Sequence, residues 1–492
     1  MIMNSTKLTA TQVSLLICEG LILLFISLAF WYPIDLYTGG RQDWLWTLWL
    51  AVPVFAMRLR VYGNLWTHTY LHDLLVIFII LTAFSYANAP FQRESYLSVM
   101  GRPLLGIWSV IYFIELTRVT RSLKPVIILF TIMSATIAFF AIGASQWDDS
   151  KMGFLRVIAD PLPQLDAGAI AMNIDGRICN PLINVIHETA CFNAGTLVEK
   201  ALLSFHVNEI AGAMAWLIPV MVTFAFMKSP AENNPPESKL HFWLIIKGIA
   251  GIISIVMIVA LILGQSRFAI VGVFATLTLL ILIQTKKSKW KYRIVGIIAI
   301  LMVIQGGLLF NVFSSTDAAI EEPVSPGLSS RDAASMAGRF AIWEQSIRMT
   351  FDYPSTGIGL YRFRTAISWD KYSIPYTPPP HAHNEWLNIG AEMGLAGLLL
   401  YISIQGVAGW MLWQGWSKGD TLIRTIALAT FAGFLSHAAY GLGDVIALWD
   451  RLHFIYWWLL GLTGAQYNLL TIQKSDLQDK LDVSDATVTM IE

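Results

Sequence analysis

A short polar stretch between hydrophobic segments carries the side chains best suited to chemistry. It runs from Pro378 to Glu385 with the sequence PPPHAHNE, just where a loop should become a membrane helix. A neutral imidazole can accept a proton from an attacking hydroxyl, and a neighbouring amide or carboxylate can orient it. We therefore expect His383 to be a catalytic or substrate-binding imidazole, with Asn384, Glu385 and His381 in supporting positions. The alternative is a structural histidine at the start of a helix.

The spacing of the two histidines argues against a metal site. His381 and His383 are two residues apart, and in an extended segment that spacing points their side chains to opposite sides. No matching cluster of Cys, His and Asp appears elsewhere in the sequence. We expect neither a metal nor another cofactor.

Arg267 is the second candidate for a catalytic role, because it stands in a very short link between two apolar runs. The link spans residues 264–267 and holds the guanidinium at the outer membrane boundary. A planar fork with several donors suits a diphosphate. Arg339 and Lys200 could complete a basic pocket with it. The alternative for these residues is a charge that reaches solvent or lipid head groups.

Composition places these residues in a membrane protein. Hydrophobic residues make up 55% of the chain and charged residues 13%, and the mean hydropathy is +0.58. Soluble domains contain about 45–50% and about 25% of these classes. The formal net charge of +0 predicts no nucleic-acid partner. No Walker loop, G-x-S-x-G, H-E-x-x-H or CxxC motif is present, which argues against an ATP-driven pump, a serine hydrolase and a zinc protease.

Apolar runs of the right length predict an all-α polytopic protein with about twelve transmembrane helices. The predicted spans lie near residues 13–31, 44–57, 71–88, 103–117, 125–143, 207–227, 241–263, 268–284, 293–313, 390–413, 424–441 and 453–472. The second span is short for a membrane crossing.

Basic residues concentrate in the links that follow even-numbered predicted spans. The link after the eighth span is the richest, with lysines and arginines clustered between residues 286 and 293. Cytoplasmic loops carry such an excess, so we place these links and both termini in the cytoplasm. Residues 144–206 and 314–389 then form two long external intervals, on the periplasmic side in a double-membrane bacterium. Cys179 and Cys191 share the first interval, where a disulfide and two free thiols are both open.

We expect the chain to divide into four regions. Residues 1–199 would hold the first five helices and the first external loop. Residues 200–415 would form the functional core, including the external loop at 314–389. Residues 416–472 would hold the last helices, and residues 473–492 a polar cytoplasmic tail.

The second external interval also contains a predicted helix. Residues 332–351 have apolar side chains at the spacing of an amphipathic helix. The helix should stop before Pro354, and the sequence Gly357-Ile358-Gly359 should then supply a turn. We expect this helix to lie on the membrane surface or to cover a cleft.

Several of these residues fall into a known order. His383-Asn384, nine further residues and then the motif G-x-x-G at 394–397 resemble the signature of the O-antigen ligase family. The O-antigen polymerases and the bacterial protein O-oligosaccharyltransferases share this signature loosely. Three further elements resemble the family in the same order: residues 205–211 at the start of a mid-chain helix, Ser266-Arg267, and residues 338–363 before the histidine. The resemblance covers roughly residues 200–415.

This resemblance implies a metal-independent, inverting glycosyltransferase of the GT-C type in the bacterial inner membrane. Its donor would be a glycan on a polyprenyl diphosphate, normally undecaprenyl diphosphate. Arg267 would bind the diphosphate, helped by Arg339 or by Lys200, which lies nearest to where the family usually has an arginine. His383 would activate or orient the acceptor hydroxyl, and the helix over 332–351 would cover the cleft.

The acceptor stays open at this point. A ligase transfers to lipid A-core, a polymerase to another lipid-linked glycan, and an oligosaccharyltransferase to a protein hydroxyl. The competing function from a different class is a transporter or flippase for lipid-linked sugars, which predicts inverted repeats and ionisable groups near the middle of the membrane. The sequence has no evident repeat, and Glu115 and Lys247 lie towards the ends of their predicted spans.

Overall fold

The computed structural model describes most of the helical part of the chain. The described residues are 9–31, 49–91, 96–143, 147–148, 173–174, 177–178, 207–227, 237–264, 266–284, 336–375, 378–448 and 452–489. Lys200, Cys179, Cys191 and the predicted span at 293–313 lie outside them.

The described residues are almost entirely helical. The α-helices are α1 (Ala10–Trp31), α2 (Ala51–Tyr62), α3 (Tyr70–Asn88), α4 (Tyr96–Thr120), α5 (Lys124–Gly143), α9 (Val207–Phe226), α10 (Glu237–Gly264), α11 (Arg267–Gln284), α14 (Met336–Asp352), α15 (Phe363–Ile367), α16 (Glu385–Lys418), α17 (Thr421–Tyr440) and α18 (Phe454–Thr489). A short 3-10 helix spans Asp370–Tyr372. Three strands of two residues each, β1 (Trp147–Asp148), β2 (Asn173–Ile174) and β3 (Arg177–Ile178), pair antiparallel in the order β1-β3-β2.

The protein is a multi-pass membrane protein. Among the described residues, seven helices are long and apolar enough to cross a membrane, and two shorter apolar helices accompany them. The second predicted span corresponds to α2, which has 12 residues. A perpendicular crossing needs about 20 residues, so α2 alone is too short. The predicted count of twelve therefore stays a prediction.

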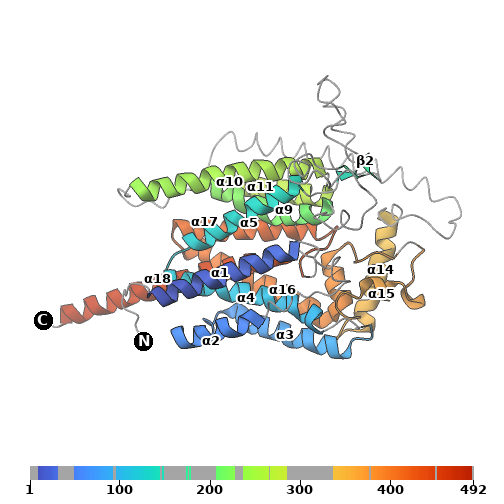
Figure 1. The fold of residues 1–492 in the computed structure, drawn as a ribbon, viewed down its shortest axis with the longest axis horizontal. Helices are drawn as coiled ribbons and strands as arrows, with labels where there is room; N and C mark the ends of the chain where they lie inside the picture. Colours follow the sequence, from blue (N-terminus) through green and yellow to red (C-terminus); the bar gives the residue numbers. More distant parts are fainter. Residues whose placement is uncertain are drawn as a thin grey trace, which may run out of the picture.

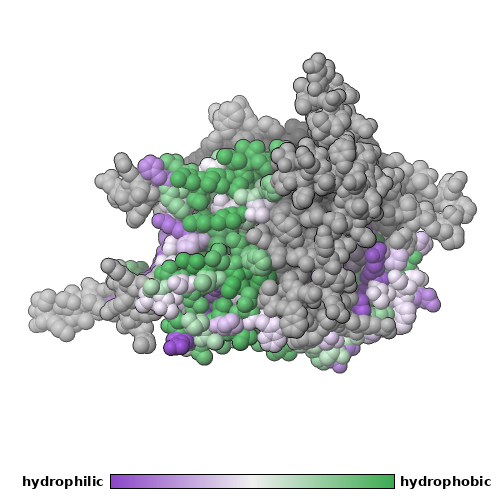
Figure 2. Space-filling model, viewed as in Figure 1, coloured by the Kyte–Doolittle hydropathy of each residue, from purple (hydrophilic) through white to green (hydrophobic). Residues whose placement is uncertain are grey.

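The flanks of the bundle have the surface expected against lipid. On α10, the side chains of Ile245, Ile252 and Ile255 are at least 60% exposed. Figure 2 shows a band of apolar side chains across the middle of this face, including the flank where α10 lies, with hydrophilic side chains towards both ends. A continuous apolar surface of this kind marks contact with a membrane or a partner.

The helices form a bundle with its chain termini at one end. In Figure 1, α5, α9, α10 and α11 run along one side, α2 and α3 along the opposite side, and α4, α16, α17 and α18 between them. Helices α14 and α15 lie at the end opposite the marked termini. The loops that meet α14 therefore gather at one end of the bundle.

Close packing of α4 against α18 depends on small residues. A Cβ on Gly106 would lie 2.3 Å from the indole of Trp457, and one on Gly461 would lie 2.4 Å from the ring of Phe113. Small residues let membrane helices approach closely enough for a large ring to pack against backbone.

Helix α16 is broken at Gly394, and the break holds the α14–α15 region in place. Gly394 has φ 71° and ψ −175°, and a Cβ there would lie 2.5 Å from the carbonyl oxygen of Pro354. The interruption frees the carbonyls of Ala391 and Glu392, which accept hydrogen bonds from the backbone N–H groups of Ile358 (2.9 Å) and Gly359 (3.2 Å). Backbone hydrogen bonds thus connect the Gly357-Ile358-Gly359 turn to α16 just before the G-x-x-G motif.

Two predictions about individual helices can be compared with the structure. The helix predicted at 332–351 is α14, which ends at Asp352. Gly357 and Gly359 then have φ values of 64° and 108°, so the predicted turn is confirmed. Where a polar tail was predicted from residue 473, α18 continues as a helix to Thr489.

Candidate functional site

The loop that carries the two histidines is fixed to the start of α16. The Asn384 side chain caps this helix, because its Oδ1 accepts from the N–H of Leu387 (3.1 Å). Its Nδ2 donates to the carbonyl of Leu442 (3.2 Å), and the N–H of Glu385 donates to the carbonyl of Gly441 (2.7 Å). Asn384 thus ties the histidine loop to residues 441–448, the loop that follows α17.

Two further contacts hold the middle of this loop from other sides. The backbone N–H of Ala382 donates to the side-chain oxygen of Asn388 (3.0 Å). Its carbonyl accepts from the indole of Trp343 on α14 (3.1 Å). Ala382, which lies between the two histidines, is therefore fixed to both α14 and α16, and this fixes the positions of His381 and His383.

The two histidines lie together, contrary to the expectation that their side chains point to opposite sides. Their ring centroids are 4.5 Å apart with an interplanar angle of 72°. The expectation was wrong because His383 is not extended. It has φ 49°, a left-handed conformation that turns the chain back and brings its ring beside His381.

Asp444 faces both imidazoles. Its Oδ1 lies 3.4 Å from Nδ1 of His383 and 3.7 Å from Nε2 of His381. Burial raises the pKa of this carboxyl, but His383, His381 and Arg339 together lower it by more than burial raises it. The pKa of Asp444 is therefore held well below its ordinary range. The carboxylate therefore stays charged at neutral pH.

Asp444 was not among the residues predicted from the sequence. One signal was available, because the residue follows the eleventh predicted span and so belongs to the same side as the histidine loop. An acidic residue between glycines and apolar residues at that exit could have been paired with His383.

Arg339 reaches the same place from α14. Its NH1 donates to the carbonyl of Gly443 (2.9 Å), and its guanidinium lies 5.5 Å from the ring centroid of Phe268. Its Nε is buried and has no hydrogen-bond partner among the described residues. Burial lowers the pKa of Arg339, Arg267 lowers it further, and Asp444 and Tyr440 raise it; the net direction is downward.

Arg267 stands at the first residue of α11 with its side chain exposed. The next residue, Phe268, packs closely on the loop after α17, since a Cβ on Gly443 would lie 2.1 Å from its ring. This contact, together with the electrostatic effect of Arg267 on Arg339, places the two guanidinium groups at the same end of the bundle. The structure thus places Arg267, Arg339 and the histidine loop at the same end of the bundle, whereas Lys200 lies outside its described residues.

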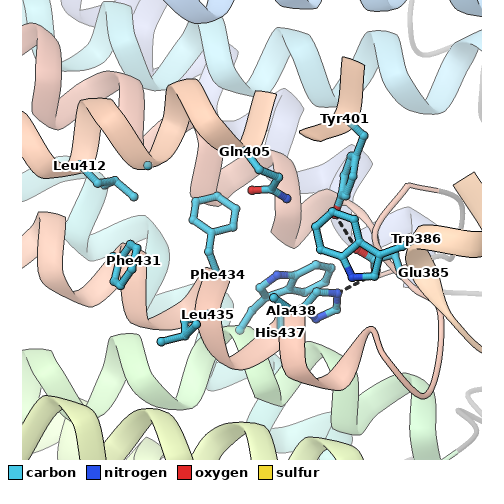
Figure 3. A pocket seen from close by; sticks show the side chains of 12 residues that line it. Glu385, Trp386, Tyr401, Gln405, Leu412, Phe431, Phe434, Leu435, His437 and Ala438 are labelled. Carbon is cyan, nitrogen blue, oxygen red and sulfur yellow. Dashed lines mark hydrogen bonds and ion pairs between the residues drawn. The ribbon is translucent and has the colours of Figure 1, made fainter. Parts of the chain in front are cut away.

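Glu385 lies away from the His383–Asp444 contact. Its side chain enters the bundle, where Oε2 lies 2.8 Å from Nε2 of His437 and Oε1 accepts from the hydroxyl of Tyr401. The ring of His437 stacks on Trp216 with centroids 3.5 Å apart. Figure 3 shows Glu385, Tyr401 and His437 converging at one end of a cavity. Glu385 therefore links α16 to α17 and does not touch His383.

The cluster could also hold a cation. Within the described part of the chain, His381, His383 and Asp444 offer one ligand atom each, and these atoms lie within 4.8 Å of one another. Two imidazoles and a carboxylate are a ligand set that zinc accepts. The neighbouring Arg339 already compensates the charge of Asp444. The ligand geometry alone does not decide whether the protein uses a metal, so metal independence stays a prediction.

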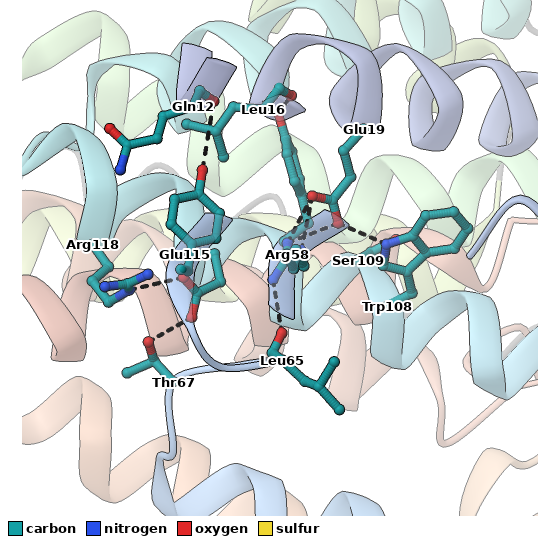
Figure 4. Close-up of polar contacts among 12 residues, drawn as sticks. Gln12, Leu16, Glu19, Arg58, Leu65, Thr67, Trp108, Ser109, Glu115 and Arg118 are labelled. Carbon is teal, nitrogen blue, oxygen red and sulfur yellow. Dashed lines mark hydrogen bonds and ion pairs between the residues drawn. The ribbon is translucent and has the colours of Figure 1, made fainter. Parts of the chain in front are cut away.

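Another buried carboxylate, that of Glu19, lies among α1, α2 and α4. Arg58 donates from NH2 to Oε1 of Glu19 (2.7 Å) and from Nε to Oε2 (3.0 Å), and both side chains are at most 1% exposed. The indole of Trp108 donates to the same carboxylate (2.7 Å). Figure 4 shows this network, in which the charged groups of Glu19 and Arg58 face each other. We interpret it as a structural junction.

A known protein family matches the part of the chain that contains most of the candidate site residues. Residues 252–402 match the model of the family described as O-antigen ligase. The match confirms the resemblance over this stretch, which contains Arg267, Arg339 and the histidine loop, whereas Asp444 lies beyond it. No curated protein matches the chain in a sequence search.

Proposed function

Because residues 252–402 match the O-antigen ligases, we propose that the protein transfers a glycan from a polyprenyl diphosphate to an acceptor hydroxyl. The proposed donor lipid is undecaprenyl diphosphate. The proposed setting is the bacterial inner membrane, with the Arg267–His383 end facing the periplasm and a GT-C-type arrangement of about twelve helices.

One observation carries this proposal. Arg339 is partly buried, its Nε is buried with no hydrogen-bond partner among the described residues, and Arg267 is near enough to lower its pKa. A buried donor without a partner and two cations close together are both unfavourable. A diphosphate between the arginines would accept from the free N–H and would neutralise the repulsion. The leaving group of the proposed reaction is such a diphosphate.

The arginines would act on the leaving group. When the bond between the anomeric carbon and the diphosphate oxygen breaks, negative charge develops on that oxygen. Fixed cations aimed at developing charge stabilise a transition state more than the ground state. We assign this role to Arg267 and Arg339, with Lys200 as a further candidate outside the described residues.

His383 would act on the acceptor. Its Nδ1 faces Asp444, so a proton on Nδ1 leaves Nε2 as the basic nitrogen. The acceptor oxygen attacks the anomeric carbon, its proton passes to Nε2, and the lipid diphosphate departs from the opposite face with inversion. Asp444 holds the ring and stabilises the imidazolium that forms, as a carboxylate does in a hydrolase triad. This step needs no metal.

Transport is the second candidate function, because transporters also contain broken helices. In such proteins the exposed backbone of the break binds the transported ion or substrate. Here the carbonyls of Ala391 and Glu392 are taken by Ile358 and Gly359, and that of Pro354 accepts from Ala396. The break in α16 is closed by the chain itself, which favours the transferase.

A deletion strain would test the function and identify the acceptor. Its surface glycans would be separated on a gel, with complementation by the wild-type gene and by His383→Ala. Loss of long glycan from lipid A-core with accumulation of lipid-linked polymer indicates a ligase, and core with a single repeat indicates a polymerase. Normal lipopolysaccharide with a missing exopolysaccharide or an unglycosylated protein places the acceptor elsewhere. An unchanged profile in the deletion strain contradicts the proposal.

A further inference from the structure

Helix α14 carries two aromatic side chains that the proposed reaction does not use. Phe340 is 59% exposed, although it lies outside the predicted membrane spans. Its ring meets the ring of Trp343 edge to face, with centroids 5.5 Å apart and an interplanar angle of 88°. An exposed phenyl ring that is held by a second aromatic ring offers a ready-made apolar surface to a ligand.

This aromatic pair lies next to the groups assigned to the reaction. The indole of Trp343 donates to the carbonyl of Ala382 (3.1 Å), in the middle of the histidine loop. Arg339 comes directly before Phe340, and its NH1 donates to the carbonyl of Gly443 (2.9 Å). The first turns of α14 therefore place a cation and two aromatic rings together at the candidate site.

The proposed chemistry requires the first sugar of the donor to lie in the same place. Its anomeric carbon is bonded to the diphosphate, which is assigned to Arg267 and Arg339, and is attacked by the hydroxyl at His383. The sugar ring must then lie between Arg339 and the histidine loop, where Trp343 contacts that loop. The C–H groups on the face of a sugar ring are weakly positive and pack on the negative face of an aromatic ring, while the hydroxyls at the edge stay free.

The exposed face of α14 is less suited to a lipid surface. Its opposite face packs on α16, so apolar and charged side chains share the face that is left. Glu344 and Arg348 form an ion pair there (2.6 Å), and their side chains are 60% and 57% exposed. Pressing this face into lipid would desolvate the pair, whereas a sugar beside Phe340 leaves it in water.

We propose that Phe340 and Trp343 form the subsite for the sugar that is bonded directly to the donor diphosphate. This inference rests on the proposed function. Phe340 would stack on one face of the sugar ring, and Trp343, fixed by its hydrogen bond to Ala382, would hold the phenyl ring in position. The contact would keep the anomeric carbon aligned with the hydroxyl at His383.

A second phenylalanine on α14 gives a matched control. Phe351 belongs to the same helix and is 68% exposed, but it stands eleven residues further along, about 16 Å from Phe340. Both side chains are more than half exposed, so replacing either one by alanine removes little packing. Phe340→Tyr keeps the aromatic ring and tests whether the ring itself is what matters.

The experiment measures the binding of two ligands, undecaprenyl diphosphate with one sugar attached and undecaprenyl diphosphate without a sugar. His383→Ala protein serves as the parent, because it should bind the donor without turning it over. The quantity compared is the ratio of the two dissociation constants. Phe340→Ala should weaken binding of the sugar-bearing ligand relative to the bare ligand about tenfold, or about 1.4 kcal/mol. Phe340→Tyr and Phe351→Ala should keep the ratio of the parent.

The outcomes separate the two proposals. An unchanged ratio in Phe340→Ala overturns the sugar subsite, and so does an equal loss of affinity for both ligands, because the ring would then contact the lipid or the diphosphate. A change of ratio in Phe351→Ala as large as that in Phe340→Ala also overturns it, since the effect would not depend on proximity to the site. Absence of binding of either ligand by the folded parent protein overturns the proposed function itself.

Discussion

Two buried carboxylates in this protein are surrounded by cations in opposite ways. Glu19 receives three close hydrogen bonds from Arg58 and one from Trp108, and the side chains of Glu19 and Arg58 are at most 1% exposed. Oδ1 of Asp444 lies 3.4 Å from Nδ1 of His383 and 3.7 Å from Nε2 of His381, and these two imidazoles are 23% and 28% exposed. The neighbouring Arg339 donates to a backbone carbonyl, and its Nε has no hydrogen-bond partner in the described part of the chain.

This contrast distinguishes a junction from a binding site. At Glu19 the charges satisfy one another, which fixes the packing of three helices and leaves nothing for a ligand. At Asp444 the surrounding groups are held by backbone contacts, the two imidazoles are partly exposed, and the Nε of Arg339 has no hydrogen-bond partner among the described residues. Buried polar groups are normally paired, so an exception at a partly open cluster marks a place for a ligand.

The largest effect that we predict on activity belongs to the open cluster. His383→Ala should lower the transfer rate by about 10³-fold, within the range for loss of a general base. The melting temperature should stay near that of the wild type, since the side chain is partly exposed and is not part of the buried core. Transfer at the wild-type rate, measured as released polyprenyl diphosphate per folded protein, would remove His383 from the mechanism.

A substitution at the Glu19–Arg58 junction should lower the stability of the protein and leave its transfer rate unchanged. Arg58→Met leaves Glu19 buried without its partner, and breaking a buried pair in this way costs about 3–5 kcal/mol. We expect a lower melting temperature in detergent and a lower yield of folded protein. The transfer rate per folded molecule should be unchanged, and a selective loss of rate with normal stability would contradict the assignment of this cluster to structure.

Asp444→Asn should have an intermediate effect. The amide keeps the shape of the side chain but removes the charge that stabilises an imidazolium at His383, so we expect kcat to fall about 10- to 100-fold. The KM for the donor should change little, because the arginines are still present. Asp444→Ala provides the control: if asparagine and alanine variants retain full kcat, Asp444 does not position the base.

The smallest predicted effect is that of a chelator. EDTA should leave transfer unchanged, because the proposed step uses only side chains. Added Zn²⁺ should inhibit by occupying His381, His383 and Asp444. Loss of activity on dialysis against EDTA with recovery on adding a divalent cation would assign a metal to this cluster and overturn the proposed role of His383.

Sequence patterns pointed to several residues of this candidate site because these residues lie at boundaries between apolar helices and polar loops or on an amphipathic helix. His383 lies at a loop-to-helix boundary, Arg267 in a link of a few residues, and Arg339 on a helix with clear amphipathic spacing. Each position is defined locally, so hydropathy and turn residues were enough to find it. The end of α14 and the turn that follows it were predictable for the same reason.

The remaining features depend on contacts between distant segments. Asp444 joins His383 across the packing of α16 on α17, and Glu385 turns into the bundle because His437 lies there. The left-handed conformation of His383 arises in a loop held by Trp343 and Asn388. No local pattern specifies such contacts, which is why the sequence placed the two imidazoles on opposite sides.

The central claim is that the arginine end holds the donor diphosphate while His383 performs the transfer. The most direct test is the binding of a polyprenyl-diphosphate glycan to purified His383→Ala, with and without Arg267→Gln. Arg267 is exposed, so its replacement should leave the fold intact. We predict that His383→Ala binds the donor as the wild type does without turning it over, and that adding Arg267→Gln weakens binding about tenfold or more. Equal binding by the single and double variants would contradict the account.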